Sequence, residues 1–235
     1  MPDNKALLVK KIFAEVPSTY ELVNHVLTLG LDVLWRRRAA KIAATANPGK
    51  WADMCTGTGD MAVCLSRLAP EGTSVYGVDF SEPMLAEARK KPEAEKIEFL
   101  AADIKSLPFD DATFDVITMS FATRNINLSR DVLVRSFAEY YRVLKPGGHF
   151  VNVETSQPSF WLIRKCFHTY IKLFVKAIGS RISRSRNAYA YLATTIPRFY
   201  QAEELAEIMR QAGFEKVTFQ KHFFGAVAIH WASKV

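Results

Sequence analysis

From residue 51 onward, segments typical of strands alternate with segments typical of helices, and this alternation limits the possible folds more than any other feature of the sequence. Strands that alternate with helices predict a parallel sheet with helices on both faces. We therefore expect a doubly wound, Rossmann-like α/β fold. The expected strands are residues 51–55, 74–80, 97–102, 114–120 and 149–154, and the expected helices between them are 60–69, 81–91 and 131–144.

The last third of the chain departs from this alternation. Residues 159–178 and 202–212 are expected to be helices, and two strand-like runs, 216–222 and 226–233, follow. Two strands joined by so short a connection pair antiparallel. The prediction is therefore a mostly parallel sheet that ends in an antiparallel hairpin, with helical additions outside it.

The length of 235 residues fits one α/β domain with added elements. We expect a single domain made of four parts. These are an N-terminal helical cap (1–46, with breaks near Pro17 and Gly30), a cofactor-binding core (47–155), a helical insertion facing substrate or membrane (156–200), and a C-terminal helix and hairpin (201–235).

The sequence also predicts where the protein works. It has no apolar run of about 18 residues and no secretory signal at its start. Its three cysteines are an odd number without a CxxC spacing, which favours reduced thiols and no bound metal. We expect a cytoplasmic protein.

Two glycines, Gly57 and Gly59, follow the first expected strand, and acidic residues lie at the ends of the next two strands. Glycines spaced in this way let the backbone turn tightly and approach a ligand. Asp79 ends the second strand, where a carboxylate accepts ribose hydroxyls. Asp103 ends the third strand, where adenine is expected, and Ser120 ends the fourth at the same edge of the sheet. The alternatives are a tight turn without a ligand and, for Asp103, a surface turn.

The same glycines are compatible with a dinucleotide such as NAD. Asp53 argues against this ligand, because it places a negative charge close to the expected position of a pyrophosphate. A sulfonium with an amino-acid tail tolerates that charge. The expected terminal hairpin also differs from a simple dinucleotide-binding fold.

Positive charge is concentrated between residues 155 and 202. This stretch holds eight lysines and arginines and no acidic residue, whereas the net charge of the whole chain is +7. On a helix, one stripe is apolar and the adjoining face is basic. The apolar stripe is Ile163, Phe167, Tyr170, Ile171, Phe174 and Ile178, and the basic face is Arg164, Lys165, His168, Lys172 and Lys176.

Several motifs together resemble those of the ubiquinone/menaquinone biosynthesis C-methyltransferases, a branch of the class I S-adenosylmethionine methyltransferases. The resemblance runs over nearly the whole chain, and its specific parts are the segment from Ser120 to Asn125 and two C-terminal motifs. The other motifs lie at Phe13, 30–36, 57–60, 107–110, 113–115, 142–148, 189–192, 212–214 and 225–230.

The resemblance implies a cofactor, S-adenosylmethionine, and residues that contact it. These are Thr58, Asp79, Asp103, Ile104 and Ser120, and we add Asp53, Gly57, Gly59 and Phe80 to the same site. Substrate contacts are expected from Asn125, Tyr189, Tyr191 and His222. No metal is expected.

The implied reaction transfers a methyl group to a ring carbon of a reduced isoprenoid quinone precursor similar to demethylmenaquinol. A ring carbon becomes nucleophilic when a hydroxyl of the quinol is deprotonated, and a free phenol has a pKa of about 10. Arg124 is the candidate catalytic residue, because a guanidinium beside that hydroxyl stabilises the developing oxyanion. The alternative for Arg124 is a structural salt bridge. His222, like His230, is more typical of a core or edge histidine than of a base.

A lipid-tailed substrate gives the basic helix a purpose at an anionic membrane surface. The alternative is a solvated face of a packed helix, and nucleic acid is a weaker interpretation because the aromatic residues share the apolar stripe. We expect peripheral membrane association and a homodimer, and no nucleic acid. Two other functions stay open: a methyltransferase for another phenolic or tetrapyrrole substrate, and a non-enzymatic cofactor-binding partner in a biosynthetic complex.

Overall fold

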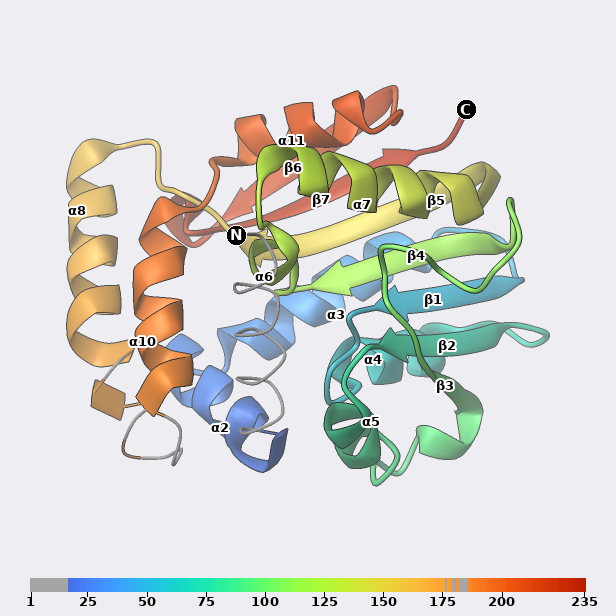
Figure 1. The fold of residues 1–235 in the computed structure, drawn as a ribbon, viewed down its shortest axis with the longest axis horizontal. Helices are drawn as coiled ribbons and strands as arrows, with labels where there is room; N and C mark the ends of the chain where they lie inside the picture. The colour runs from blue at the N-terminus through green and yellow to red at the C-terminus, as the bar shows by residue number, and fades with distance from the viewer. Residues whose placement is uncertain (1–16, 176, 179–180, 182–185) are drawn as a thin grey trace.

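The computed structural model describes residues 17–175, 177–178, 181 and 186–235. It contains a seven-stranded sheet with the strand order β3-β2-β1-β4-β5-β7-β6 (Figure 1). The first five strands pair in parallel, and β5–β7 and β7–β6 pair antiparallel. The strands are β1 (Lys50–Met54), β2 (Ser74–Asp79), β3 (Ile97–Ala101), β4 (Phe114–Ser120), β5 (Leu144–Thr155), β6 (Lys216–His222) and β7 (Val227–Ser233).

Helices cover both faces of the sheet. On one face α7 and α11 pack on a core that includes Phe137, Phe150 and Phe214, and on the other face α3 and α4 pack on a core around Trp51. The central strands are apolar on both sides, as parallel strands buried on both faces must be. These helices are α3 (Leu31–Ala43), α4 (Asp60–Leu68), α5 (Glu82–Ala88), α7 (Arg130–Val143) and α11 (Ala202–Gln211).

A further group of helices lies beyond the carboxyl edge of the parallel strands (Figure 1). There α2, α8 and α10 form a small core of their own around Val23, Ile171 and Tyr189. This group therefore forms a cover over the edge of the sheet at which ligands bind in doubly wound folds. The elements are α2 (Pro17–Thr28), α6 (Thr123–Ile126), α8 (Trp161–Tyr170), η2 (Ile171–Val175), α10 (Arg186–Thr195), η3 (Ile196–Arg198) and η4 (Phe223–Gly225), and η1 (Ala94–Lys96) lies before β3.

The doubly wound sheet and the antiparallel hairpin are confirmed, and so is the break at Gly30. Gly30 has a φ of 76° between α2 and α3. The helical prediction for residues 4–16, together with the motif residue Phe13, lies outside the described residues. The expected helix 81–91 begins after Ser81 but ends at Ala88.

The fifth strand begins earlier than predicted, at Leu144 instead of residue 149. Leu144 pairs with Phe114, whereas the next pair is Val116 with His149, so the register shifts between them. The extra residues include Pro146, and Gly147 takes a φ of 77°. A bulge of this kind lets a Pro-Gly-Gly segment lie within a strand that would otherwise exclude it.

The basic helix also differs from the prediction. Its α-helical part ends at Tyr170, and residues 171–175 form a π-helical turn, which changes the angular spacing of the side chains. Ile171 and Val175 are buried, whereas Phe174, expected on the apolar stripe, is exposed. Lys176 of the expected basic face lies outside the described residues. The short helices α6 and α10 were not predicted from the sequence pattern.

Candidate active site

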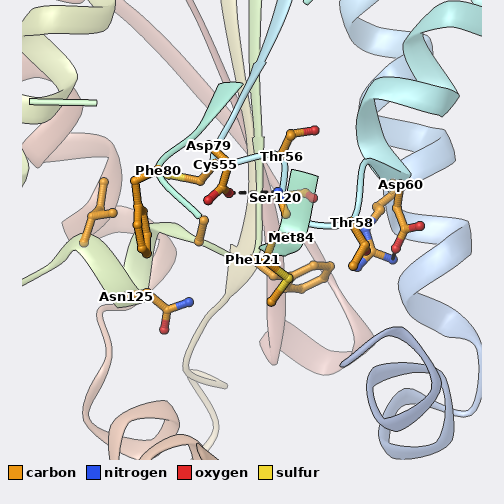
Figure 2. A pocket seen from close by; sticks show the side chains of 14 residues that line it. Cys55, Thr56, Thr58, Asp60, Asp79, Phe80, Met84, Ser120, Phe121 and Asn125 are labelled. Carbon is orange, nitrogen blue, oxygen red and sulfur yellow. Dashed lines mark hydrogen bonds and ion pairs between the residues drawn. The ribbon is translucent and has the colours of Figure 1, made fainter. Parts of the chain in front are cut away.

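A groove lies at the carboxyl ends of β1, β2 and β4 (Figure 2). Parallel strands place the loops that follow them at one edge, so residues distant in sequence meet there. In Figure 2, Asp79 and Ser120 lie between Phe80 on one side and Thr58 and Asp60 on the other. The lining residues that matter most are Thr58, Asp79, Phe80, Met84, Ser120 and Asn125.

The loop from β1 to α4 needs both of its glycines, for different reasons. Gly57 has a φ of 55°, and a Cβ placed on it would meet no atom within 4 Å, so its backbone is open towards the groove. Gly59 has a φ of 83°, and a Cβ there would lie 3.0 Å from the Cβ of Ala88. Gly57 therefore lines the groove, whereas Gly59 allows α4 and α5 to pack closely.

Asp79 is the buried carboxylate of the groove. Its Oδ2 accepts a hydrogen bond from the backbone N–H of Gly57 at 2.9 Å, and its Oδ1 accepts one from the N–H of Ser81 at 2.9 Å. Burial raises the pKa of Asp79, and these backbone hydrogen bonds oppose that rise. The backbone N–H of Phe80 also acts on this carboxylate. The two oxygens have four lone pairs between them, so capacity remains for a ribose hydroxyl.

Asp53 lies beneath the same loop and is not among the residues that line the groove. Its carboxylate accepts hydrogen bonds from the hydroxyls of Thr56 at 2.7 Å and Thr118 at 2.8 Å. Burial raises the pKa of Asp53 to about 7, although the two hydroxyls oppose the rise. The side chain therefore ties the loop to β1 and β4 and supports the groove from below.

Two residues expected to contact the cofactor, Asp103 near adenine and Ile104, lie outside the lining of the groove. Asp103 is exposed, and its Oδ1 accepts the backbone N–H of Lys105 at 3.0 Å. Ile104 is buried in the core. Asp103 is nevertheless close enough to Cys55, which lines the groove, to contribute to the raised pKa of that thiol, whose main cause is burial.

An apolar cavity adjoins the groove. It has a volume of about 410 Å³ and lies between the sheet edge and the covering helices, with walls from α2, α3, α8, η2, α10 and η4. Phe121 and Arg36 line both the groove and the cavity, so they form the boundary between the two spaces. Among the described residues these two are shared by both linings, so a ligand in the cavity meets a ligand in the groove beside them.

Arg124 lies in the wall of the cavity, at the first turn of α6. It is 6% exposed, and its Nε and Nη1 atoms have no hydrogen-bond partner among the described residues. Its backbone N–H donates to Oε2 of Glu154 at 3.0 Å. No ion pair of Arg124 is found in the described part of the chain, so the alternative of a structural salt bridge finds no support.

The other residues expected to contact the substrate, Asn125, Tyr189 and Tyr191, do not line the cavity. Asn125 lines the groove, and Tyr189 is buried in the small core formed by the covering helices. Tyr191 is half-buried on α10; burial raises the pKa of its phenol, the charge of Arg124 lowers it and that of Glu154 raises it. The charge of Arg124 therefore acts on the phenol of Tyr191.

The two hairpin histidines lie apart from the groove. His222 is buried, with its Nδ1 3.2 Å from Nη1 of Arg38, and burial together with Arg38 lowers its pKa. His230 places its Nε2 2.8 Å from the carbonyl oxygen of Ala202, and burial lowers its pKa to about 4. Both sit in the positions of edge or core histidines, and neither lines the groove or the cavity.

Sequence reasoning missed the residues at the boundary between groove and cavity. Arg36 forms an ion pair with Asp32 at 2.6 Å, and both are buried on α3. The guanidinium carbon of Arg36 lies 5.4 Å from the ring centroid of Phe121, which takes a φ of 54° at the end of β4. The i, i+4 spacing of Asp32 and Arg36 is a common surface pattern, so only the tertiary structure reveals that the pair is buried.

The groove fits S-adenosylmethionine better than a dinucleotide. A buried carboxylate at the end of β2 suits a ribose, and Phe80 beside it offers apolar contact to a base. A pyrophosphate would lie near the carboxylate of Asp60, which lines the groove. Together with the antiparallel strands β7 and β6, these features define an S-adenosylmethionine-dependent methyltransferase of class I.

Comparison with known proteins identifies the family. The model of the ubiE/COQ5 methyltransferase family matches residues 1–234, and the chain belongs to this family. It is 38% identical over 226 residues to a ubiquinone/menaquinone biosynthesis C-methyltransferase of Desulfotalea psychrophila, covering 96% of this chain and 90% of the relative. It is 39% identical over 221 residues to a demethylmenaquinone methyltransferase of Thermus thermophilus, covering 93% and 98% of the two chains.

Solved structures of lower identity share the fold. A methyltransferase of Thermotoga maritima, described as a possible histamine N-methyltransferase, superposes with a TM-score of 0.67 at 23% identity, covering 97% of this chain and all of the other. A methyltransferase of Aquifex aeolicus superposes with a TM-score of 0.61 at 19% identity, covering 100% and 99%. The protein is an S-adenosylmethionine-dependent methyltransferase, so the alternative of a non-enzymatic partner is set aside.

Proposed function

We propose that this enzyme methylates a ring carbon of a reduced isoprenoid quinone precursor similar to demethylmenaquinol. The observation that carries the proposal is the pairing of the cofactor groove with an apolar cavity whose wall holds Arg124. The other cation of that wall, Arg36, is paired with Asp32, whereas Arg124 has no ion pair among the described residues. Relatives at 35–39% identity bear the name demethylmenaquinone methyltransferase, which supports the same class of substrate.

The residues of the cavity suit this chemistry. When bound, the cofactor supplies an electrophilic methyl group on a sulfonium. The ring carbon needs an activating phenolate, and a free phenol has a pKa of about 10, so the cavity must stabilise the anion. Arg124 does this by donating hydrogen bonds to the developing oxyanion from Nε and Nη1, which have no partner in the part of the chain that the structure describes. The apolar walls exclude water, which strengthens that interaction.

The mouth of the cavity suits a substrate with a long apolar tail. Leu29, Phe223 and Phe224 line the cavity and are also exposed; Leu29 is 86% and Phe224 is 74% exposed. All three take positive φ angles of 47–55°, which non-glycine residues seldom adopt. Such strain persists only where the surrounding structure imposes it, so we infer that this rim is where the tail leaves the cavity.

We also propose peripheral association with an anionic membrane, in the cytoplasm. On α8 and the turn η2 that follows it, Trp161 is 66% exposed beside Lys165 and Lys172, and neither lysine has an acidic partner among the described residues. Exposed Leu162 and Phe174 lie on the same segment. An aromatic and basic face of this kind is typical of interfacial helices. No helix in the described ranges is long and apolar enough to span a bilayer.

The decisive experiment is a methyl-transfer assay with labelled S-adenosylmethionine. The acceptors are a long-tailed demethylquinol, the same quinone without reductant, a tailless naphthoquinol, and a simple phenol. We expect label only in the reduced acceptors, and more with the long-tailed one. Equal labelling of the oxidised quinone would overturn the proposal, and preference for the simple phenol would favour the phenolic alternative. The homodimer stays a prediction, which light scattering tests.

A further inference from the structure

Arg36 and Asp60 lie together at one end of the cofactor groove. Both line the groove, and Arg36 is only 5% exposed. Nη1 of Arg36 lies 3.7 Å from Oδ2 of Asp60, a separation too long for a direct hydrogen bond. A cation and a carboxylate therefore stand side by side at this end of the groove without closing on each other.

Each of the two charges is held by a second partner. Nη1 of Arg36 donates to Oδ2 of Asp32 at 2.6 Å, and its guanidinium lies over the ring of Phe121. Asp60 accepts a hydrogen bond through Oδ1 from Nζ of Lys91 at 2.6 Å. Because Asp32 and Lys91 hold the two charged groups, the orientation of Arg36 and Asp60 is set before any ligand binds. This lowers the entropic cost of binding.

The order of residues along the groove says which part of the cofactor reaches this end. In S-adenosylmethionine the base and the amino-acid tail leave the ribose in opposite directions. With the ribose at Asp79, Phe80 lies on one side, and Thr58 and Asp60 lie on the other (Figure 2). The apolar side suits the base. The amino-acid tail therefore extends towards Asp60 and Arg36.

We infer that Arg36 binds the α-carboxylate and Asp60 the α-ammonium group of the cofactor's methionine part. The tail is a zwitterion, and its two charges match the side-by-side cation and carboxylate. Asp32 acts as a positioning residue, since it holds the guanidinium of Arg36 at the boundary with the apolar cavity. The inference rests on the cofactor placement used above, with the ribose at Asp79.

Calorimetric titration with two unreactive ligands tests the inference. S-adenosylhomocysteine carries the full amino-acid tail, whereas 5′-methylthioadenosine keeps the nucleoside but has no charged tail. Arg36→Gln should weaken binding of S-adenosylhomocysteine about 10- to 100-fold, the loss expected for charge-assisted hydrogen bonds, and leave methylthioadenosine within about twofold. Asp60→Asn should act in the same selective way. Arg37→Gln, at the exposed neighbouring arginine on α3, is the matched control and should change neither affinity.

Arg36→Gln removes the cation beside the buried Asp32, so the double variant Asp32→Asn/Arg36→Gln is measured as well. The same selective loss in the double variant supports the inference. Unchanged affinity for S-adenosylhomocysteine, or an equal loss for both ligands, would overturn it. Asp79→Ala separates the cofactor placement from the roles of Arg36 and Asp60. It should weaken binding of both ligands, and if it weakens binding of neither, the cofactor placement itself is wrong.

Discussion

The backbone N–H of Arg124 donates to Oε2 of the fully buried Glu154 at 3.0 Å, while the guanidinium of Arg124 lies apart from this carboxylate in the wall of the apolar cavity. The other oxygen, Oε1, accepts the backbone N–H of Thr155 at 2.7 Å and its hydroxyl at 2.8 Å. Glu154 therefore fixes the first turn of α6 through the backbone and leaves the side chain of Arg124 available to a substrate.

Arg124→Ala should lower kcat and leave cofactor affinity near normal. We expect a loss of roughly 10²- to 10³-fold, the size found when one oxyanion-stabilising donor is removed. Arg124→Lys should restore only part of the rate, because a point charge does not reproduce the planar fork of a guanidinium. Steady-state kinetics with a reduced demethylquinol gives the rate, and calorimetry with S-adenosylhomocysteine gives the affinity.

Arg135→Ala is the control for Arg124, because Arg135 is exposed on α7 and does not line the cavity. Its kcat should equal that of the wild type. Full kcat in Arg124→Ala would remove Arg124 from the mechanism. A parallel loss of cofactor affinity would give it a structural role.

Asp79→Ala should weaken cofactor binding and leave the fold in place. The carboxylate offers charge-assisted hydrogen bonds to ribose hydroxyls, and their loss costs about 1.5–3 kcal/mol. Calorimetry measures the affinity and thermal unfolding measures the stability. Because Asp79 also accepts hydrogen bonds from Gly57 and Ser81, Asp79→Asn is included, and the exposed Asp110→Asn is the control. Wild-type affinity in both Asp79 variants would place the ribose elsewhere.

Asp53 should make folding stability depend on pH. Its pKa is about 7 in the folded protein and about 3.9 in an unfolded chain, so folding favours the protonated form. The contribution is fully present below about pH 4 and is lost as the pH rises through about 7. Between about pH 5 and pH 8, the free energy of unfolding should therefore fall more in the wild type than in Asp53→Asn, which stays neutral.

Urea denaturation at about pH 5, 6.5 and 8 tests the role of Asp53. The comparison between the two proteins removes the titration of groups that they share. Identical pH dependence would mean that the buried carboxyl does not titrate in this range.

The parts of the fold that periodicity and turn residues determine could be predicted from the sequence. The strands of the sheet lie within a few residues of their expected positions, because a buried parallel strand requires a short apolar run. The bulge in β5 could not be predicted, since Pro146 and the glycines after it are also typical of a chain that leaves a sheet. The π-helical turn at residues 171–175 depends on packing against α10, which is a tertiary contact.

The residues of the site also divide into those that the sequence pattern predicts and those that only tertiary packing reveals. Gly57, Asp79 and Ser120 lie at strand ends, so topology alone brings them together. The role of Asp53 was harder to predict, because its position in the sequence does not say whether its side chain points into the groove or beneath the loop. Arg36 comes from a helix before the first strand, and only the packing of α3 brings it to the groove.

Lys165 and Lys172 should contribute to binding of anionic vesicles. Each lysine near such a surface contributes about 1 kcal/mol, so Lys165→Gln/Lys172→Gln should bind roughly 30-fold more weakly. Vesicle sedimentation at rising salt should show release of the wild type, because exposed charges are screened. Lys96→Gln/Lys105→Gln, at exposed sites outside α8, is the control. Equal binding by all three proteins, or none by the wild type, would leave α8 as a solvated helix.

Cys166 should report occupancy of the apolar cavity. It is the exposed one of the three cysteines and lines the cavity, whereas burial raises the pKa values of the Cys55 and Cys64 thiols. A thiol is alkylated through its thiolate, so a maleimide should modify Cys166 first. A long-tailed, unreactive quinol analogue should slow this labelling, whereas S-adenosylhomocysteine alone should not. Mass spectrometry identifies the labelled residue, and Cys166→Ser is the control that should lose the fast phase. Labelling of Cys166 at an unchanged rate with the analogue bound would show that the tail does not occupy this cavity.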